Sequence, residues 1–245
     1  MTHYVLFDTE TTGNQEEDRI IQFGAMIVNQ QGQVECYDEF CSSDVEIKLE
    51  AMEVHNITPD LIVGKPKATE TAFYKRLEEL NSQENYLIAH NISFDLGMIE
   101  KEGFINSLQI IDTLRCAKHL FPEMPYHRLQ YLRYALELYK TEAQEAAKHN
   151  ITIKAHDAIG DVLVMKLFLS KLVTKCREIY PDYNPMEKLA DLTRTPVLIK
   201  TFRFGKYRGR DITEVAQEDP GYLNWMKTSM DLDEDLKYTL DKVLG

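Results

Sequence analysis

Two carboxylates stand one residue apart where a short apolar run ends, in the stretch LFDTETTG at residues 6–13. Side chains of a β-strand alternate between its faces, so Asp8 and Glu10 would point the same way. Like charges that close repel each other, which raises a pKa unless a cation offsets the repulsion. On these residues alone, the pattern fits a cation site and equally a buried strand that ends at Asp8 in a polar turn.

Two further acidic motifs follow expected element boundaries. In AHNISFD, a helix that begins after Asn91 would place Asp95 in its first turn, where backbone N–H groups favour an anion. In HDAIGD, Asp157 and Asp161 are four residues apart and share a helix face, and His156 on the approach loop can reach the same point as Asp161. We expect Asp161 to face the site and Asp157 to complement the helix dipole outside it. Each motif alone also fits a solvated helix start.

The elements that must position these residues alternate between strand and helix patterns. Strand patterns cover residues 3–8, 20–28, 34–40, 86–90 and 108–112. Helical periodicity covers residues 71–80, 128–138, 143–150 and 158 to about 176. The segment QQGQ between the second and third strands suits a hairpin turn. We therefore expect an α/β fold in which helices cover a mixed sheet.

Length and composition are those of an ordinary folded protein. The 245 residues are 44% hydrophobic and 28% charged, which allows a sizeable core. We expect a cytoplasmic protein with no membrane contact, because no apolar run approaches the length of a bilayer span and the N-terminus lacks a signal pattern. The four cysteines form no C-x-x-C pair and are expected to be reduced. The net charge of -12 argues against a general polyanion-binding surface, so any nucleic acid contact must be local or metal-assisted.

The last sixty residues differ in pattern from the rest of the chain. We place a break at residues 180–185, which separates a domain at 1–180 from a small module at 186–245. Residues 188–210 hold seven Lys or Arg against one acid, whereas residues 211–245 hold three bases against nine acids. The stretch TFRFGKYRGRDI predicts a short strand, a turn and a second strand, with helices after it. So small a unit has few core residues, and four aromatic ones are expected to be buried: Phe202, Phe204, Tyr222 and Trp225.

The basic side chains of this module have two interpretations. In the first, they reach phosphates while Phe204 or Tyr207 stacks on a base. In the second, they face the acidic remainder of the chain. The segregation of charge favours nucleic acid contact, by Arg203, Lys206, Arg208 and Arg210.

Together, D-x-E on a strand, H-N-x-x-F-D at a helix start and H-x-x-x-x-D at another resemble the three motifs of the histidine-bearing branch of the DEDD exonuclease superfamily. The resemblance implies a ribonuclease H-like fold, with a mixed five-stranded sheet flanked by helices, and 3′-to-5′ exonuclease activity. It also implies that two Mg²⁺ or Mn²⁺ ions are held by Asp8, Glu10, Asp95 and Asp161, and oxygen ligands suit such hard cations. His156 would be the general base, a task that suits an imidazole near neutral pH.

The resemblance extends to exodeoxyribonuclease X-like proteins. The segment AMEVHNIT resembles the family segment that lines the pocket of the terminal nucleotide, which implies contacts by His55 and Ile57. The other substrate contacts that the resemblance implies are Thr11, Asn91 and Phe94. Residues 201–226 resemble the small C-terminal module of these proteins, so the resemblance covers almost the whole chain.

The expected function is hydrolysis of DNA from its 3′ ends by a free-standing enzyme of repair or recombination. Three alternatives stay open: an RNA 3′-end trimming exoribonuclease, a polymerase proofreading subunit and a non-catalytic nucleic acid-binding domain. The presence of all four carboxylates and the histidine disfavours the last. The sequence leaves open the strand preference, the processivity, the physiological pathway and whether the chain forms a homodimer.

Overall fold

A computed structural model describes residues 1–152 and 157–245 of the chain. The expected general base, His156, lies outside the described residues. The described chain divides into two compact units, Met1–Thr193 and Arg194–Gly245. Helix α9 (Pro185–Arg194) was expected to open the module, but its Leu189, Ala190 and Leu192 are buried in the core of the first unit. The division between the units therefore lies about one helix further along the chain than the expected break.

The first unit is built on a mixed five-stranded sheet, as expected. The strands have the spatial order β3-β2-β1-β4-β5. Strand β1 pairs antiparallel with β2 and parallel with β4, β2 pairs antiparallel with β3, and β4 pairs parallel with β5. Gly32 has a φ of 79° in the turn between β2 and β3, a left-handed conformation that glycine adopts easily. The bounds are β1 (His3–Thr11), β2 (Ile20–Asn29), β3 (Val34–Phe40), β4 (Tyr86–Ala89) and β5 (Gln109–Asp112).

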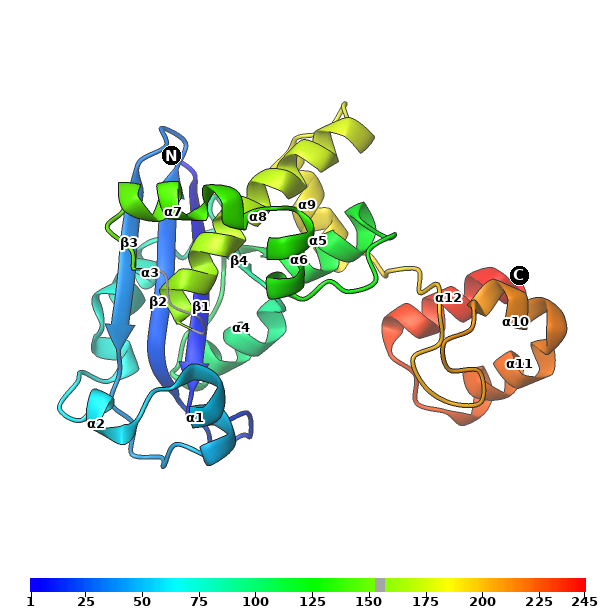
Figure 1. Ribbon diagram of the computed structural model, residues 1–245, viewed down its shortest axis with the longest axis horizontal. Coiled ribbons are helices and arrows are strands. Elements are labelled where there is room, and N and C mark those ends of the chain that lie inside the picture. The colour runs from blue at the N-terminus through cyan, green and yellow to red at the C-terminus, as the bar shows by residue number, and fades with distance from the viewer. Residues whose placement is uncertain (153–156) are drawn as a thin grey trace. The chain divides into compact units, whose positions relative to one another are not determined.

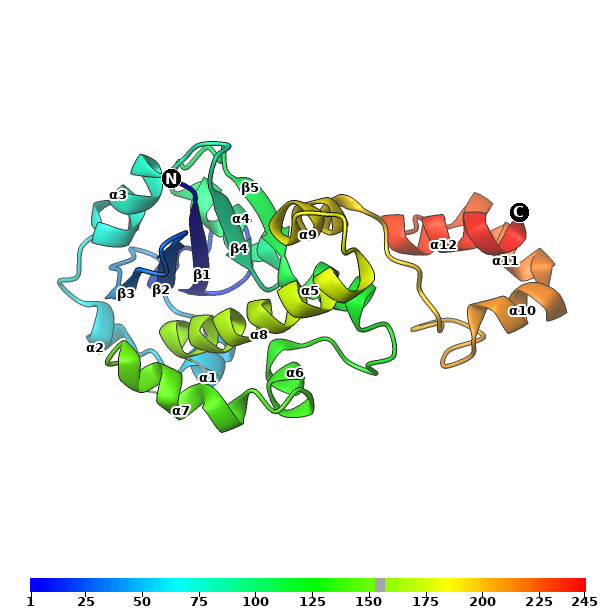
Figure 2. The same ribbon diagram turned by 90° about the horizontal axis from the view of Figure 1, so that it is seen from above.

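Helices cover both faces of this sheet (Figures 1 and 2). Leu6 on β1 packs in one core with the helices that follow β5: α5 (Thr113–Leu120), α6 (Leu129–Ala135), α7 (Tyr139–Lys148), α8 (Ala158–Ile179) and α9. Val5 and Phe7 pack in a second core on the opposite face, with α3 (Ala72–Glu79) and α4 (Ile92–Lys101). The short helices α1 (Leu49–His55) and α2 (Pro59–Ile62) follow β3. Because successive side chains of β1 point to opposite faces, the position of a carboxylate along β1 determines the face of the sheet to which it points.

The long helix α8 begins directly against β2. A Cβ atom added at Gly24 would lie 2.3 Å from the carbonyl carbon of Ala158, so only glycine allows this close approach. Most of the apolar side chains of α8 are buried, which fits a helix that crosses the sheet. The contact fixes the first turn of α8, and with it Asp161, over the centre of the sheet.

The second unit is helical, with α10 (Ile212–Glu218), α11 (Pro220–Ser229) and α12 (Glu234–Leu244). The two strands expected at residues 201–212 are wrong: this segment is a loop closed by one antiparallel bridge between Thr201 and Asp211. Gly205 and Gly209 have φ values of 75° and 87°, which interrupt extended backbone.

The expected aromatic core of the second unit is only partly correct. Phe202 is buried and Tyr222 is half-buried, but Phe204 and Trp225 are 42% and 51% exposed. Aliphatic side chains from the three helices fill most of the core instead: Ile212, Val215, Leu223, Met226, Leu236 and Leu240. The amphipathic helices thus supply enough aliphatic surface to leave two large aromatic rings in contact with solvent.

Two smaller expectations concern the cysteines and the membrane. All four cysteines are free thiols, as expected, and Cys41, Cys116 and Cys176 are buried. Burial raises the pKa of the Cys41 and Cys116 thiols to about 12, so these thiols are unreactive at neutral pH. In the part of the chain that the structure describes, no helix has the length and apolarity that a membrane crossing requires.

Candidate active site

Asp8 and Glu10 lie at the carboxyl end of β1, the central strand of the sheet. Asp8 is opposite Gly24 and Glu10 is opposite Gln22 in the antiparallel register, and a bulge follows Glu10. Both carboxylates share the parity of Leu6, so they point the same way, as expected, and they face the side of the sheet that α8 covers. Parallel β4 ends beside this point, and ligands of open α/β sheets commonly bind at such strand ends.

Asp95, on α4, lies against the same end of β1. It lies in the first turn of α4, as expected, but its 3% exposure shows that it is not a solvated helix-start residue. The backbone N–H and the hydroxyl of Thr9 donate to its Oδ1 at 3.0 and 2.8 Å. Asn91 adopts a left-handed φ of 73° before the helix, which turns the chain sharply from β4 into α4. These contacts hold the Asp95 carboxylate against β1.

The two aspartates at the start of α8 contact different partners. Asp157 is the residue that precedes the helix, and its Oδ1 accepts a hydrogen bond of 3.2 Å from Gln22 on β2. Asp161 is in the first turn, and its Oδ1 accepts a hydrogen bond of 2.6 Å from the side-chain amide of Gln130 on α6. The two carboxylates are thus held by different elements, Asp157 by β2 and Asp161 by α6.

The carboxylates at this strand end resist ionisation. Burial, followed by the charges of Asp95, Glu10 and Asp161, raises the pKa of Asp8 well above its usual range. Burial, followed by the charges of Asp161 and Asp95, raises the pKa of Glu10 to about 8. Burial also raises the pKa of Asp95 to about 7, although the hydrogen bonds from Thr9 oppose the shift. Ionising these carboxylates would thus place several negative charges close together in a buried site.

The donor chemistry of this cluster suits a hard divalent cation. Such a cation prefers carboxylate oxygens and would lower the pKa values that burial and repulsion have raised. Among the described residues, no three acidic, histidine or cysteine side chains already converge as ligands around one point. The fit therefore rests on the type of the donors and on their electrostatic coupling.

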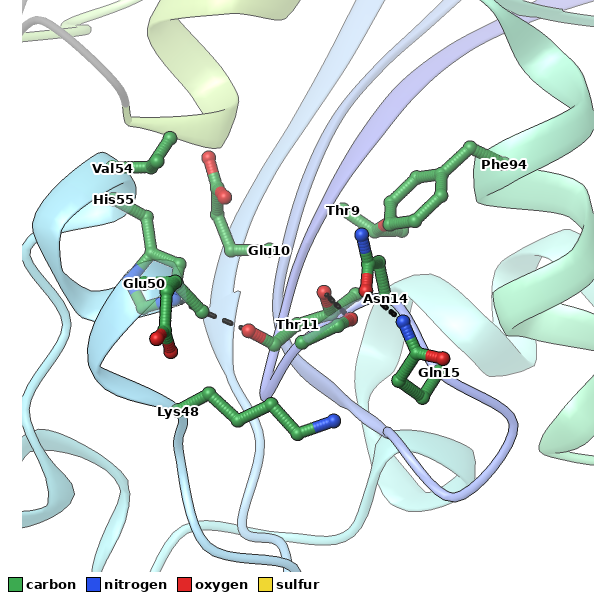
Figure 3. Close-up of a pocket in the computed structure, with 12 residues that line it drawn as sticks. Thr9, Glu10, Thr11, Asn14, Gln15, Lys48, Glu50, Val54, His55 and Phe94 are labelled. Atoms are coloured by element: carbon green, nitrogen blue, oxygen red, sulfur yellow. Dashed lines mark hydrogen bonds between the residues drawn. The ribbon is translucent and has the colours of Figure 1, made fainter.

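A pocket of about 510 Å³ opens beside Glu10 (Figure 3). Val54 and His55 on α1 form one wall, Phe94 on α4 stands on the opposite side, and Glu10 points toward the start of α8 between them. Three of the expected substrate contacts line this pocket: Thr11, His55 and Phe94. Two others have different surroundings, since Ile57 packs in a buried cluster with Ile21, Ile47 and Ile62, and Asn91 donates its backbone N–H to Asp112.

His55 is a fixed, neutral part of the pocket wall. Its Nδ1 accepts from the backbone N–H of Ile57 at 2.9 Å, and because that group can only donate, this ring nitrogen carries no proton. Its Nε2 then carries the proton and donates to the carbonyl of Thr11 at 3.2 Å. Burial lowers the pKa of His55, which keeps the ring neutral. His55 thus ties α1 to the end of β1.

The sequence patterns did not indicate the ion pair that anchors the loop after β1. The carboxylate of Asp18 is fully buried and lies 2.6 Å from the ammonium of Lys48. It also accepts hydrogen bonds from the Thr12 hydroxyl at 2.8 Å and the Gln15 backbone at 2.7 Å. Burial alone would raise the pKa of Asp18, but these donors outweigh it and lower the pKa. Lys48, Asn14 and Gln15 line the pocket, and only the folded loop brings them there.

Comparison with known families gives the chemistry of this arrangement. A family model described as Exonuclease matches residues 5–168, which include both acidic strand positions and the first turn of α8. The chain belongs to the exonuclease family. The protein is therefore a nuclease that cleaves from chain ends, and it is a hydrolase. A second model, described as Exodeoxyribonuclease X-like C-terminal, matches residues 202–228 of this exonuclease.

Relatives and solved structures agree with this membership. Exodeoxyribonuclease 10 of Escherichia coli K12 is 29% identical over 245 residues, which cover 98% of this chain and 97% of that protein. A PolC-type DNA polymerase III of Bacillus cereus is 32% identical over 187 residues, which are 74% of this chain and 12% of that protein. Exonuclease X in complex with 5′ overhanging duplex DNA has a TM-score of 0.57 at 21% identity, over 78% of this chain and 99% of that one. These likenesses and the sheet order confirm the expected α/β, ribonuclease H-like fold.

Proposed function

We propose that this exonuclease hydrolyses DNA from its 3′ ends in a reaction that requires two Mg²⁺ or Mn²⁺ ions. The observation that carries the proposal is the group of carboxylates with raised pKa values beside a pocket of about 510 Å³. The substrate class is supported by the full-length relative named exodeoxyribonuclease and by the exonuclease X complex with DNA. A role in DNA repair or recombination and a location in the cytoplasm follow from the same proposal.

Four carboxylates would hold the ions: Asp8, Glu10, Asp95 and Asp161. When bound, such ions stabilise the charge that builds on the phosphoryl oxygens and lower the pKa of a water. The chain itself orients the ligands, since Thr9 fixes Asp95 through two hydrogen bonds and the β1 register turns Asp8 and Glu10 to one face. His156, one residue before Asp157 in the sequence, would accept the proton of the attacking water, as the resemblance of the H-x-x-x-x-D motif implies.

The pocket would take the terminal nucleotide. Phe94 and Val54 are 37% and 52% exposed on opposite walls, where a base can pack between them. Thr11, whose carbonyl contacts the ring of the wall residue His55, would lie near the sugar. Ile57 and Asn91 would act indirectly, Ile57 by holding the His55 ring through its backbone N–H and Asn91 by turning the chain into α4.

The C-terminal unit would also contact the DNA. Lys206 lies 3.0 Å from Asp219, and Arg210 makes a two-point pair with Glu218 at 2.7 and 2.8 Å. Arg203 and Arg208 are exposed, and no ion pair with an acid is found for either within the described residues. We therefore assign the DNA contact first to Arg203 and Arg208, with exposed Phe204 and Trp225 as stacking surfaces, and to Lys206 and Arg210 second.

Digestion of end-labelled oligonucleotides tests this function. Matched DNA and RNA strands would be incubated with the full chain and Mg²⁺, or with EDTA, and the products separated by size. The expected result is stepwise shortening of DNA from its 3′ end, which EDTA abolishes. Faster cleavage of RNA would make the protein an exoribonuclease, and no cleavage of either strand with Mg²⁺ or Mn²⁺ would contradict the proposed site.

A further inference from the structure

Gln130 on α6 contacts one of the proposed metal ligands from outside the carboxylate group. Its Nε2 lies 2.6 Å from Oδ1 of Asp161, and its Oε1 lies 3.1 Å from Nη1 of Arg133. A guanidinium group only donates hydrogen bonds, so the atom that faces Arg133 must be the amide oxygen. The NH₂ group must then face Asp161. Arg133 thus fixes which way the Gln130 amide points.

Arg133 is itself held by a buried partner. Its Nε and Nη2 donate to the two oxygens of Glu142 on α7 at 2.7 and 2.6 Å. The side chains of Arg133 and Glu142 are only 18% and 3% exposed. Two parallel bonds between planar groups restrict orientation more than one bond does. Arg133 cannot swing away without leaving a buried carboxylate unpaired.

The backbone brings these three side chains to Asp161. Glu137 adopts a left-handed φ of 56° at the turn of the chain from α6 into α7. Leu132 of α6 and Ala146 of α7 are buried in the core that α8 also enters. Both helices pack on α8, so Gln130 is held at a set place relative to the first turn of α8.

The geometry points to Gln130 as a positioning residue that sets the orientation of the Asp161 carboxylate for a divalent cation, with Arg133 and Glu142 as its anchor. A carboxylate turns easily about its last bond, because that torsion is broad. A donor that holds one oxygen limits this rotation before the cation arrives. The inference rests on the proposed function, because it assigns Asp161 to metal binding.

Gln130→Met tests the role, since methionine keeps the length of the side chain and removes the amide. Calorimetric titration with Mn²⁺ should show a dissociation constant raised about 10- to 100-fold, the usual effect of losing a bond that orients a metal ligand. The kcat for a DNA oligonucleotide should fall, while its KM stays within about twofold. Gln130 is not among the described residues that line the pocket, so binding of the terminal nucleotide should be unaffected.

Gln144→Met is the matched control. Gln144 is an exposed glutamine on α7, and its replacement should leave the Mn²⁺ affinity and kcat unchanged. Thermal unfolding of both variants would show that they fold. If Gln130→Met does not fold, Gln130→Asn replaces it, since the shorter amide cannot reach Asp161 and Arg133 together and the same loss is expected.

The outcomes separate this inference from the proposed function. Unchanged Mn²⁺ affinity and kcat in a folded Gln130 variant, with an active wild type, would overturn the inference and leave the function in place. A wild-type protein that binds no Mn²⁺ and cuts no DNA would overturn both. A weakened Mn²⁺ affinity with unchanged KM, absent in Gln144→Met, is the result that supports the inference.

Discussion

The two units of the molecule hold their charged side chains in opposite ways. At the end of β1, carboxylates stand close together, and burial and mutual repulsion raise the pKa values of Asp8 and Glu10. In the C-terminal unit, Lys206 and Arg210 are paired with acids: a hydrogen bond from Tyr207, followed by Lys206, lowers the pKa of Asp219, and Arg210 lowers the pKa of Glu218. The first arrangement opposes folding unless a cation binds, whereas the second is compatible with folding alone.

The environment of a charged side chain indicates its role better than the number of charges nearby does. The stretch at residues 188–210 holds seven bases against one acid, yet two of its four expected DNA contacts are engaged within their own unit. The acidic residues of β1 are few, but they lie beside the pocket and have no comparable partners in the described protein. Strongly perturbed ionisable groups in a cleft are the better indicator of a functional site.

Asp8→Ala should have the largest effect, because it removes the proposed metal ligand whose charge interacts with those of the other three, Glu10, Asp95 and Asp161. We expect activity to fall by about 10⁴-fold or more, which corresponds to the several kcal/mol that metal ions supply. Calorimetric titration with Mn²⁺ should also show a lower stoichiometry. Asp182→Ala, at an exposed acidic position, is the control that should change neither. Unchanged Mn²⁺ stoichiometry in Asp8→Ala would contradict the assignment of the carboxylates at the end of β1 to metal binding.

His156→Ala should lower kcat by about 10²- to 10⁴-fold, the range typical of a lost general base. Histidine is not needed as a ligand for a hard cation, so Mn²⁺ binding and KM for DNA should remain close to wild type. Single-turnover cleavage with saturating enzyme gives the rate of the chemical step. A full rate in this variant would remove His156 from the mechanism.

The pair Arg203→Ala and Arg208→Ala should raise KM for DNA several-fold with little change in kcat. Each lost phosphate contact should lower the slope of log affinity against log salt by about 1, so the double variant should lose about 2. The matched double variant Lys206→Ala with Arg210→Ala should have a smaller effect, because those side chains already have acidic partners. DNA binding by the two double variants would be measured at several salt concentrations. Equal losses of affinity in both would contradict the assignment of the DNA contact to Arg203 and Arg208.

In the metal-free protein, Glu10→Gln should have only a small effect on stability, a rise of a few degrees in the melting temperature. The folded pKa of Glu10, about 8, lies above the ordinary glutamate value of 4.5, so the folded state binds more protons and stability falls as pH rises between those values. Glutamine removes this loss, so the gain should be larger at pH 8.5 than at pH 5. Thermal unfolding of both proteins in EDTA between pH 5 and pH 8.5 measures this gain in melting temperature.

Glu218→Gln is the counterpart in the C-terminal unit. Its exposed pair with Arg210 lowers the pKa of Glu218, so the amide should give no rise in melting temperature. A similar gain in both variants would mean that the two regions do not differ in the way described here.

Much of the fold could be predicted because local patterns determine it. The apolar run of β2, the short strand pattern of β3 and the long apolar periodicity of α8 predicted elements close to those observed. The expected strands at residues 201–212 were wrong because two glycines with positive φ outweigh the alternation of aromatic and basic side chains. The pattern resembled a strand, but the backbone conformation of those glycines does not continue one.

The site could be predicted only where its residues lie in short motifs. Asp8, Glu10 and Asp95 stand at strand and helix ends that the sequence indicates, and the fold couples them electrostatically. Gln130 and Lys48 carried no such signal, because they reach Asp161 and Asp18 from segments about 30 residues away in the chain. Contacts of that kind depend on the packing of α6 and of the loop before α1, which no local pattern encodes.

The most direct test of the central claim is anomalous X-ray diffraction from crystals grown with Mn²⁺ and a nucleoside 5′-monophosphate. The account predicts two anomalous peaks within coordination distance of Asp8, Glu10, Asp95 and Asp161, with the nucleotide in the pocket beside His55 and Phe94. Peaks confined to surface carboxylates, or no peak near Asp8, would contradict the claim that these side chains form a two-metal exonuclease site.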